Sequence, residues 1–174
     1  MGKYKYDPKV YGMKVTFTGF FCTVLLFFSV VKMLTASALS LWFLVCVICT
    51  YTVWETFISL SNPSVVIMDG GQIVFEAFGR RHSYRWEEIS CFRVREFTGA
   101  KKLFLRINNA GFLKGRYWLN CYYFNNSDLL YKQIVDIELS FHPDSIKARA
   151  RRGASESAAR AARETVADRE TEKN

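Results

Sequence analysis

The stretch VTFTGFFCTVLLFFSVV, residues Val15–Val31, contains 17 consecutive residues without a charged side chain. After the single Lys32, Met33–Trp54 adds 22 further uncharged residues. Because a bilayer core about 30 Å thick is crossed by about 20 apolar helical residues, each run is long enough to span it. The pattern predicts a transmembrane hairpin over residues 15–61, with spans at about 15–34 and 38–60 and a loop at Thr35-Ala36-Ser37.

Two other structures could produce apolar runs of this length. A buried helix pair in a soluble protein normally keeps one polar face on each helix, and neither run has one. A cleaved signal peptide would be followed by a cleavage site and a mature domain, whereas here a second apolar run follows at once. The membrane hairpin is therefore the favoured interpretation.

Basic residues at the outer ends of the hairpin predict its orientation. Basic residues accumulate on the cytoplasmic side of membrane proteins, and the connecting loop has only Lys32 beside it. Both termini are therefore expected in the cytoplasm. The residues that support this orientation precede the first span and follow the second: Lys3, Lys5, Lys9 and Lys14, then Arg80, Arg81 and Arg85.

Beyond Pro63 the apolar residues alternate with polar ones, which predicts strands. The first two expected strands, Val65–Met68 and Gln72–Phe78, are separated by Asp69-Gly70-Gly71, a strong tight-turn signal. Later alternation predicts strands near 82–86, 90–96, 103–107 and 112–124. A stripe of apolar residues at helical spacing then predicts one amphipathic helix: Leu130, Ile134, Ile137 and Phe141.

These patterns divide the chain into four parts. A basic cytoplasmic segment at 1–14 precedes the hairpin, and an α+β domain occupies 62–147. The remaining residues, 148–174, are dominated by Ala, Arg and Glu and contain no aromatic residue. Such a composition cannot bury a core, so we expect a disordered or marginally helical charged tail.

About seven short strands followed by one amphipathic helix resemble the plan of a pleckstrin-homology (PH) domain. The resemblance is to bacterial membrane proteins with a PH-like domain directly after a two-span hairpin. It is carried by the strand Ile73–Phe78, the pair Arg80-Arg81 and the step Trp86-Glu87-Glu88-Ile89. It implies a small β-barrel or sandwich with a C-terminal capping helix, in a protein of the bacterial cytoplasmic (inner) membrane. Trp86 and Ile89 would be structural anchors of that domain.

The motifs of common enzymes are missing from the sequence. There is no glycine-rich phosphate loop, GxSxG elbow or HExxH motif. His82 and His142 have no cysteine or carboxylate at metal-ligand spacing. Glu87 and Glu88 are adjacent, so on a strand end they point to opposite faces and cannot share one substrate atom. We therefore expect no catalytic residues, no metal and no cofactor.

Charge is distributed unevenly over the domain. Ten basic and three acidic residues lie between Arg80 and Arg116, a balance of +7, whereas one lysine and four acids between Asp128 and Asp144 give −3. A basic surface beside an anionic membrane gains about 1 kcal/mol per near-surface charge, although a merely solvated surface is equally compatible. The residues expected to contact anionic lipid or an acidic partner are Arg80, Arg81, Arg93, Arg95, Lys101 and Lys102.

Two functions fit these expectations. The favoured one is a non-enzymatic accessory or scaffold subunit that binds other integral membrane proteins through its PH-like domain. The alternative is a regulatory module whose domain senses anionic lipid headgroups. The expected first hairpin loop, Asp69-Gly70-Gly71, is acidic, which disfavours the route by which PH domains grip phosphoinositides. Aromatic residues among the arginines could stack on nucleic-acid bases, but they occupy expected core positions, so nucleic acid is not expected as a partner. A small-molecule substrate is not expected either.

Overall fold

The computed structural model describes residues 2–35, 41–111, 113–154 and 157. The chain divides into two compact units, Met1–Ile134 and Val135–Asn174. The fold is α+β, with two apolar helices followed in sequence by strands that form two antiparallel sheets. Most of the expected loop, at Ala36-Ser37, and most of the expected tail, residues 155–156 and 158–174, lie outside the described residues.

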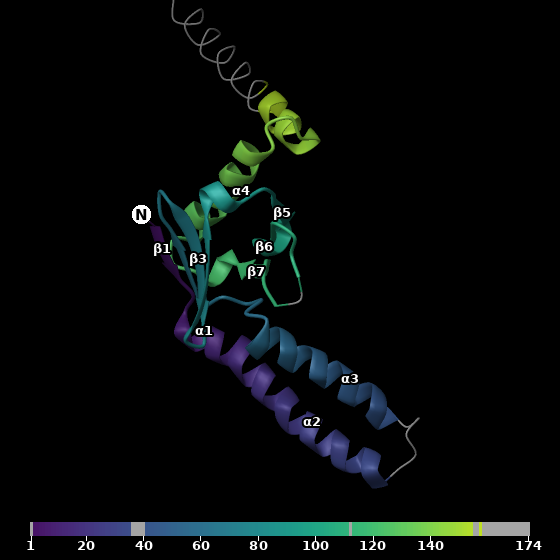
Figure 1. The fold of residues 1–174 in the computed structure, drawn as a ribbon. Coiled ribbons are helices and arrows are strands. Elements are labelled where there is room, and N and C mark those ends of the chain that lie inside the picture. The colour runs from purple at the N-terminus through teal and green to yellow at the C-terminus, as the bar shows by residue number, and fades with distance from the viewer. Residues whose placement is uncertain (1, 36–40, 112, 155–156, 158–174) are drawn as a thin grey trace, which may run out of the picture. The chain divides into compact units, whose positions relative to one another are not determined.

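The hairpin consists of two long helices that lie side by side (Figure 1). The first runs without a break through α1 (Pro8–Tyr11), a π-helical turn η1 (Gly12–Thr16) and α2 (Phe17–Thr35). The second comprises α3 (Leu41–Val53) and a π-helical turn η2 (Trp54–Ile58). Both Pro8–Thr35 and Leu41–Ile58 are long and apolar enough to cross a membrane. Of the spans expected at 15–34 and 38–60, residues 15–34 and 41–58 are helical, and the first helix begins earlier than expected.

Asp7 and Pro8 explain why the first helix begins before the apolar run. The Asp7 carboxylate accepts a hydrogen bond from the main-chain N–H of Lys9 at 2.9 Å, which satisfies one of the free donors at the helix start. Pro8 occupies the first turn, where its fixed φ and missing N–H suit a helix. These two residues add a basic, water-compatible turn to the apolar span.

The two helices approach closely where a small residue meets the second helix. A Cβ atom on Gly19 would lie 2.8 Å from the ring of Phe57 and 2.8 Å from Cγ2 of Thr56, which is shorter than real side-chain contacts allow. Small residues permit this kind of close packing in membrane helix pairs. Gly19 therefore sets the distance between the helices at the end nearest the sheets.

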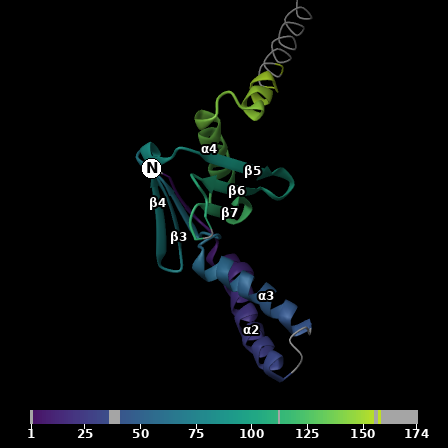
Figure 2. The ribbon, with the colours of Figure 1, turned by 45° about the vertical axis from the view of Figure 1, so that its right-hand side comes forward.

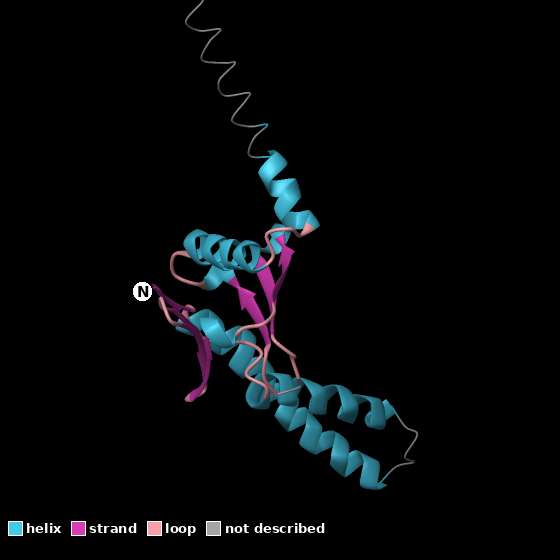
Figure 3. Cartoon of the chain, turned by 45° about the horizontal axis from the view of Figure 1, so that its top comes forward, coloured by secondary structure: helices cyan, strands magenta, loops and turns pink. Residues whose placement is uncertain are grey.

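The strands form one four-stranded and one three-stranded sheet, seen as two magenta groups in Figure 3. The first sheet has the order β1 (Gly2–Lys5), β2 (Val65–Met68), β3 (Gln72–Ala77) and β4 (Arg80–Arg85). The second, visible in Figure 2, has the order β5 (Phe92–Phe97), β6 (Lys102–Ile107) and β7 (Arg116–Asn120). The turn expected at Asp69-Gly70-Gly71 connects β2 to β3. Strand β1 was not expected, and it joins the segment before the hairpin to the sheet after it.

The inner faces of the two sheets meet in an aromatic core. Phe75 of β3 and Tyr117 of β7 are fully buried, and their rings stack with centroids 4.0 Å apart at 12°. At one side a single bridge joins Tyr6 to Phe124. At the other side, the 3₁₀ turn Trp86–Glu88 separates β4 from β5, and no ladder joins these two strands among the described residues. Of the two expected forms, a β-barrel or a sandwich, the closed barrel is not formed among the described residues, and the sheets pack as two layers.

The expected C-terminal helix is α4 (Ser127–Phe141), which begins in the first unit and ends in the second. Its first half is attached to the sheets. Leu130 and Ile134 are fully buried, and the Gln133 side chain accepts a hydrogen bond from the Tyr4 hydroxyl at 2.7 Å. In the second unit, Glu138 pairs with Lys147, and residues 146–154 are helical.

Candidate binding surface

The outer face of the β5–β6–β7 sheet carries basic side chains and no acidic ones. Along each strand, alternate residues point inward and are buried, such as Phe92, Val94 and Leu105. The residues between them point outward because successive side chains of a strand lie on opposite faces. We call this surface the arginine–aromatic face; it comprises Arg93, Arg95, Phe97, Lys102, Phe104, Arg106, Arg116, Trp118 and Asn120.

Strand register arranges three of these arginines in one row. Arg93 of β5 lies opposite Arg106 of β6, and Arg106 lies opposite Arg116 of β7. Neighbouring strands are about 4.7–4.9 Å apart, so three positive charges occupy adjacent positions. Like charges directly opposite one another destabilise a sheet. An anionic ligand on this face would relieve that repulsion.

An aromatic cluster lies beside the arginine row. Arg95, Phe104 and Trp118 form the next row across the three strands. The Trp118 ring lies 4.5 Å from that of Phe104 and 5.7 Å from that of Phe97. Trp118 nevertheless remains 40% exposed and Phe97 36% exposed. With five basic and no acidic residues among its nine, the face combines fixed positive charge with accessible aromatic surface.

Three of the six predicted contact residues lie on this face, namely Arg93, Arg95 and Lys102, and all three are exposed. Lys101 lies next to it, in the β5–β6 turn, but its ammonium group is 2.8 Å from the Asp128 carboxylate of α4. Its hydrogen bond to Asp128 raises the pKa of Lys101. Lys101 therefore holds the start of α4 to this turn.

The other two predicted contact residues, Arg80 and Arg81, lie on the first sheet and not on this face. Arg80 donates hydrogen bonds to the main-chain oxygens of Ile58 at 2.7 Å and Phe57 at 3.3 Å. These are the last carbonyls of the second long helix, where a positive charge is favourable. Arg81 donates to the Glu76 carboxylate at 2.6 Å from Nε. Both guanidinium groups thus have partners within the fold.

The turn before Arg80 also contacts the hairpin. Phe78 and Gly79 have positive φ values of 50° and 72°, as a two-residue type I′ hairpin turn requires. Positive φ is unusual for a bulky residue such as phenylalanine. The Phe78 ring lies 5.3 Å from that of Phe57 and 5.7 Å from that of Tyr11. Together with Arg80, this turn fastens the first sheet to the hairpin.

The two predicted anchors, Trp86 and Ile89, lie at the connection between the sheets. Ile89 is buried. Trp86 is half-buried, and its indole N–H donates to the main-chain oxygen of Asp69 at 2.8 Å. Trp86, the first residue of the 3₁₀ turn, therefore holds the β2–β3 turn in place through this hydrogen bond.

Six residues of the face were not predicted as contact residues: Phe104, Arg106, Arg116, Trp118, Phe97 and Asn120. The signal for the first two was present, since Phe104 and Arg106 alternate with the buried Leu103, Leu105 and Ile107. Arg116 and Trp118 alternate with buried Tyr117 and Leu119 in the same way. What the sequence could not supply is the register that places the three strands side by side.

A buried polar network lies between the two sheets. The Tyr117 hydroxyl is 2.7 Å from that of Tyr84 and 2.9 Å from Nδ1 of His82. Burial raises the pKa of Tyr84 and of Tyr117. Burial, together with the positive charges of Lys114 and Arg80, lowers the pKa of His82. The network therefore favours neutral partners at neutral pH and stabilises the core without an ion pair.

No family model, curated protein or solved structure matches this chain. Among the described residues, no group of three or more His, Cys, Asp or Glu side chains could hold a metal ion. The function must therefore be argued from the geometry of the chain itself.

Proposed function

We propose that this chain is a non-enzymatic, membrane-anchored accessory or scaffold subunit that binds an acidic partner protein through its arginine–aromatic face. In this proposal the hairpin anchors the chain in a bacterial cytoplasmic membrane, and the partner is another integral membrane protein with an acidic cytoplasmic segment. The observation that carries the proposal is the in-register row Arg93–Arg106–Arg116 beside exposed Trp118.

The surface of the two long helices supports membrane anchoring. Within the most apolar 18-residue stretch of each helix, only 11% of the residues are buried, whereas a core helix of a soluble protein would be mostly covered. Large apolar side chains lie open along both helices, with Phe27 75% exposed and Leu34 84% exposed. Lipid would cover this surface and remove the cost of exposing it to water.

The pairing of β1 with β2 supports termini on one side of the membrane. Strand β1 precedes the first long helix and β2 follows the second, and their residues pair from Gly2↔Met68 to Lys5↔Val65. This pairing supports a placement of both hairpin ends on the same side, and basic residue counting favours the cytoplasm.

Cysteine labelling tests this topology. We expect Lys3→Cys and Lys173→Cys to be unreactive toward a membrane-impermeant maleimide in intact bacterial cells, because both would face the cytoplasm. Permeabilised cells should label both. Ser37→Cys, between the two helices, should be labelled in intact cells and serves as the matched control. Labelling of either terminal position from outside would reject the orientation.

Two features support a PH-like character for the domain. Its described residues form seven strands in two antiparallel sheets, with α4 placed after the last strand. The first half of this helix is fastened to both sheets, through Tyr4 and Gln133 and through Lys101 and Asp128. Strand β1, which precedes the hairpin, forms one edge of the first sheet. The proposed domain therefore includes residues from both before and after the hairpin.

The residue types on the face favour a protein partner over a bare membrane surface. Four of its five basic residues are arginines, whose planar guanidinium groups bind carboxylates with two parallel hydrogen bonds. Trp and Arg are also enriched among the residues that contribute most to protein–protein binding. Binding to a fluid lipid surface requires positive charge, but the basic side chains need not lie in a fixed row.

Charge reversal on the face tests the proposed partner binding. We expect Arg93→Glu with Arg95→Glu to weaken binding of a synthetic peptide of alternating Glu and Phe residues at least tenfold, measured by fluorescence anisotropy. Reversing two central interface charges repels the acidic ligand, and one such residue is worth about 2 kcal/mol or more. The wild-type affinity should also fall as salt rises, since exposed charges are screened.

The matched control changes the same charge elsewhere. Arg85→Glu with Lys132→Glu reverses two exposed basic residues outside the face and should leave peptide binding unchanged. In mild detergent, a stoichiometric membrane protein should co-purify with wild-type and control proteins but not with the face variant. A monomer that floats with anionic liposomes, equally well in all three, would instead support the lipid-sensing module.

A further inference from the structure

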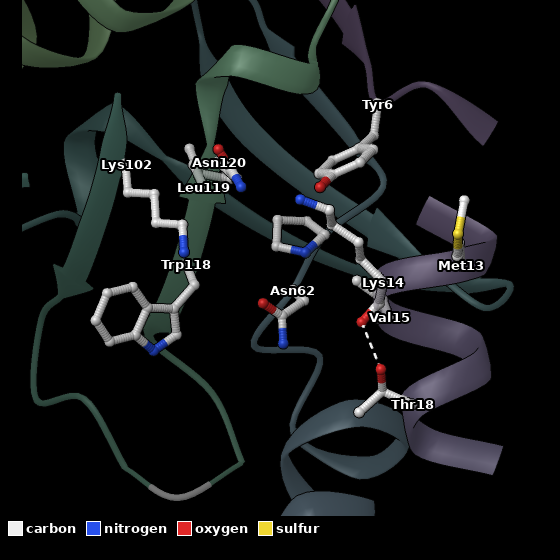
Figure 4. Close-up of a pocket in the computed structure, with 11 residues that line it drawn as sticks. Tyr6, Met13, Lys14, Val15, Thr18, Asn62, Lys102, Trp118, Leu119 and Asn120 are labelled. Carbon is white, nitrogen blue, oxygen red and sulfur yellow. Dashed lines mark hydrogen bonds between the residues drawn. The ribbon is translucent and has the colours of Figure 1, made fainter. Parts of the chain in front are cut away.

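A cavity of about 630 Å³ lies where the first long helix meets the second sheet. Figure 4 shows Lys102 and Trp118 on one wall and Lys14 and Thr18 of the helix on the other. Asn62, from the segment after the hairpin, lies between these walls. The volume is within the range of about 300–1,000 Å³ that is usual for ligand pockets.

The cavity is lined by residues that suit an anion. Its eleven lining residues include two lysines, Lys14 and Lys102, and no acidic residue. The Lys14 ammonium donates to the Tyr123 hydroxyl at 2.5 Å and lies 4.3 Å from the centroid of that ring. An ammonium group has three N–H donors, so Lys14 is held in place while donors remain for a ligand.

The helix wall of the cavity is formed by the π-helical turn η1. Met13, Lys14 and Val15 belong to this turn, which comes directly before the apolar span. Single π-helical turns inside longer helices often occur at functional sites. Lys14 thus lies at the point along the chain where basic residues give way to 17 uncharged ones.

A main-chain hydrogen bond connects the second wall to the same level of the hairpin. The main-chain N–H of Trp118 donates to the oxygen of Ser61 at 2.7 Å, three residues after the end of η2. If the hairpin spans a bilayer, the cavity therefore lies at the boundary between the hydrocarbon and the water, where lipid phosphates reside. Tryptophan is enriched at this boundary because one end of its ring is apolar and the other polar.

We infer that this cavity binds the phosphate-bearing headgroup of one anionic phospholipid, with Lys14 and Lys102 contacting the phosphate and Met13 and Val15 contacting the start of the acyl chains. The inference rests on the proposed membrane placement of the hairpin and not on the acidic partner. Lys102 and Trp118 belong both to the cavity and to the arginine–aromatic face. A soluble phosphate compound offers the same anion, but the apolar side chains beside the lysines favour the lipid.

Binding of short-chain lipids to the full-length protein in mild detergent tests the inference. We expect dihexanoyl phosphatidylglycerol to bind at least tenfold more tightly than dihexanoyl phosphatidylcholine, which carries no net charge. Lys14→Ala with Lys102→Ala should remove this preference, as should Lys14→Gln with Lys102→Gln, which preserves more of the side-chain length. Lys3→Ala with Lys5→Ala removes two exposed lysines of β1 and should change nothing.

Two outcomes would overturn the inference, and both are independent of the partner. An unchanged preference in both lysine variants, with circular dichroism showing a folded protein, would place the lipid elsewhere. Displacement of the lipid by an equal concentration of inorganic phosphate would show that the site takes soluble phosphate instead. Arg93→Glu with Arg95→Glu leaves the cavity intact, so it should weaken peptide binding while lipid binding persists.

Discussion

Replacing Phe75 with alanine should destabilise the domain by about 3–5 kcal/mol, the usual cost of truncating a buried phenylalanine. Phe75 is fully buried on β3, and its ring stacks on that of Tyr117 from the other sheet. The substitution therefore removes apolar burial and also the stacked pair that joins the two sheets. Urea or thermal unfolding of the full-length protein in detergent, followed by circular dichroism, measures the loss.

Phe97→Ala is the matched control for this prediction. Phe97 belongs to the outer face and is 36% exposed, so its removal leaves little or no cavity. We expect a loss of about 1 kcal/mol or less, as is usual for surface substitutions. If Phe97→Ala destabilised the protein as much as Phe75→Ala, the aromatic core would not lie between the sheets.

The hairpin and most of the strands could be predicted because their signals are local. An uninterrupted apolar run depends only on consecutive residues, and the alternation of Phe92 and Val94 with Arg93 and Arg95 sets the inner and outer sides of β5. Phe92 and Val94 are buried and Arg93 and Arg95 are exposed, as this alternation requires. The alternation of inner and outer side chains does not depend on which strand lies beside it.

The segment before the hairpin shows where local patterns were insufficient. Lys3, Tyr4, Lys5 and Tyr6 alternate, and Tyr4 and Tyr6 are buried. Four residues of alternation are too short to distinguish a strand from a basic tail. The partner of β1, strand β2, begins 60 residues after β1 ends, so only the folded chain shows that they pair.

Arg80 and Arg93 illustrate why the candidate surface was predicted only in part. Both are exposed arginines in a basic stretch, yet one binds the end of a helix and the other belongs to a row across three strands. Sequence shows that a charge is present but not what lies opposite it. The long-range register of β5, β6 and β7 decides that.

Strong alkali should unfold the protein, because several buried groups must stay protonated in the folded state. Burial raises the pKa of Tyr6 to about 12 and that of the Cys121 thiol to about 12. Burial also raises the pKa of Tyr4, Tyr84 and Tyr117. In the unfolded chain these tyrosines would ionise near pH 10. The folded state thus binds more protons than the unfolded state in alkali.

The sign of the effect follows from this difference in bound protons. A pKa that is raised in the folded state contributes stability that is complete below the unfolded pKa and is lost as pH rises through the folded value. Since the pKa of each of these groups is raised, their contributions are all lost in the same direction as the solution becomes alkaline. The melting temperature should therefore fall steeply between about pH 10 and pH 12.

Tyrosine-to-phenylalanine substitutions separate this effect from general alkaline damage. Tyr6→Phe keeps the ring contacts with Tyr11 and Phe124 but cannot ionise, so the variant should lose less stability than the wild type between pH 10 and pH 12. Tyr122→Phe changes a ring that is 66% exposed and should leave the pH dependence unaltered.

Melting curves at pH 8, 10 and 12 decide the matter. A wild-type melting temperature that stays constant over this range would show that these hydroxyls and the thiol are not buried, and the two-layer aromatic core would be wrong.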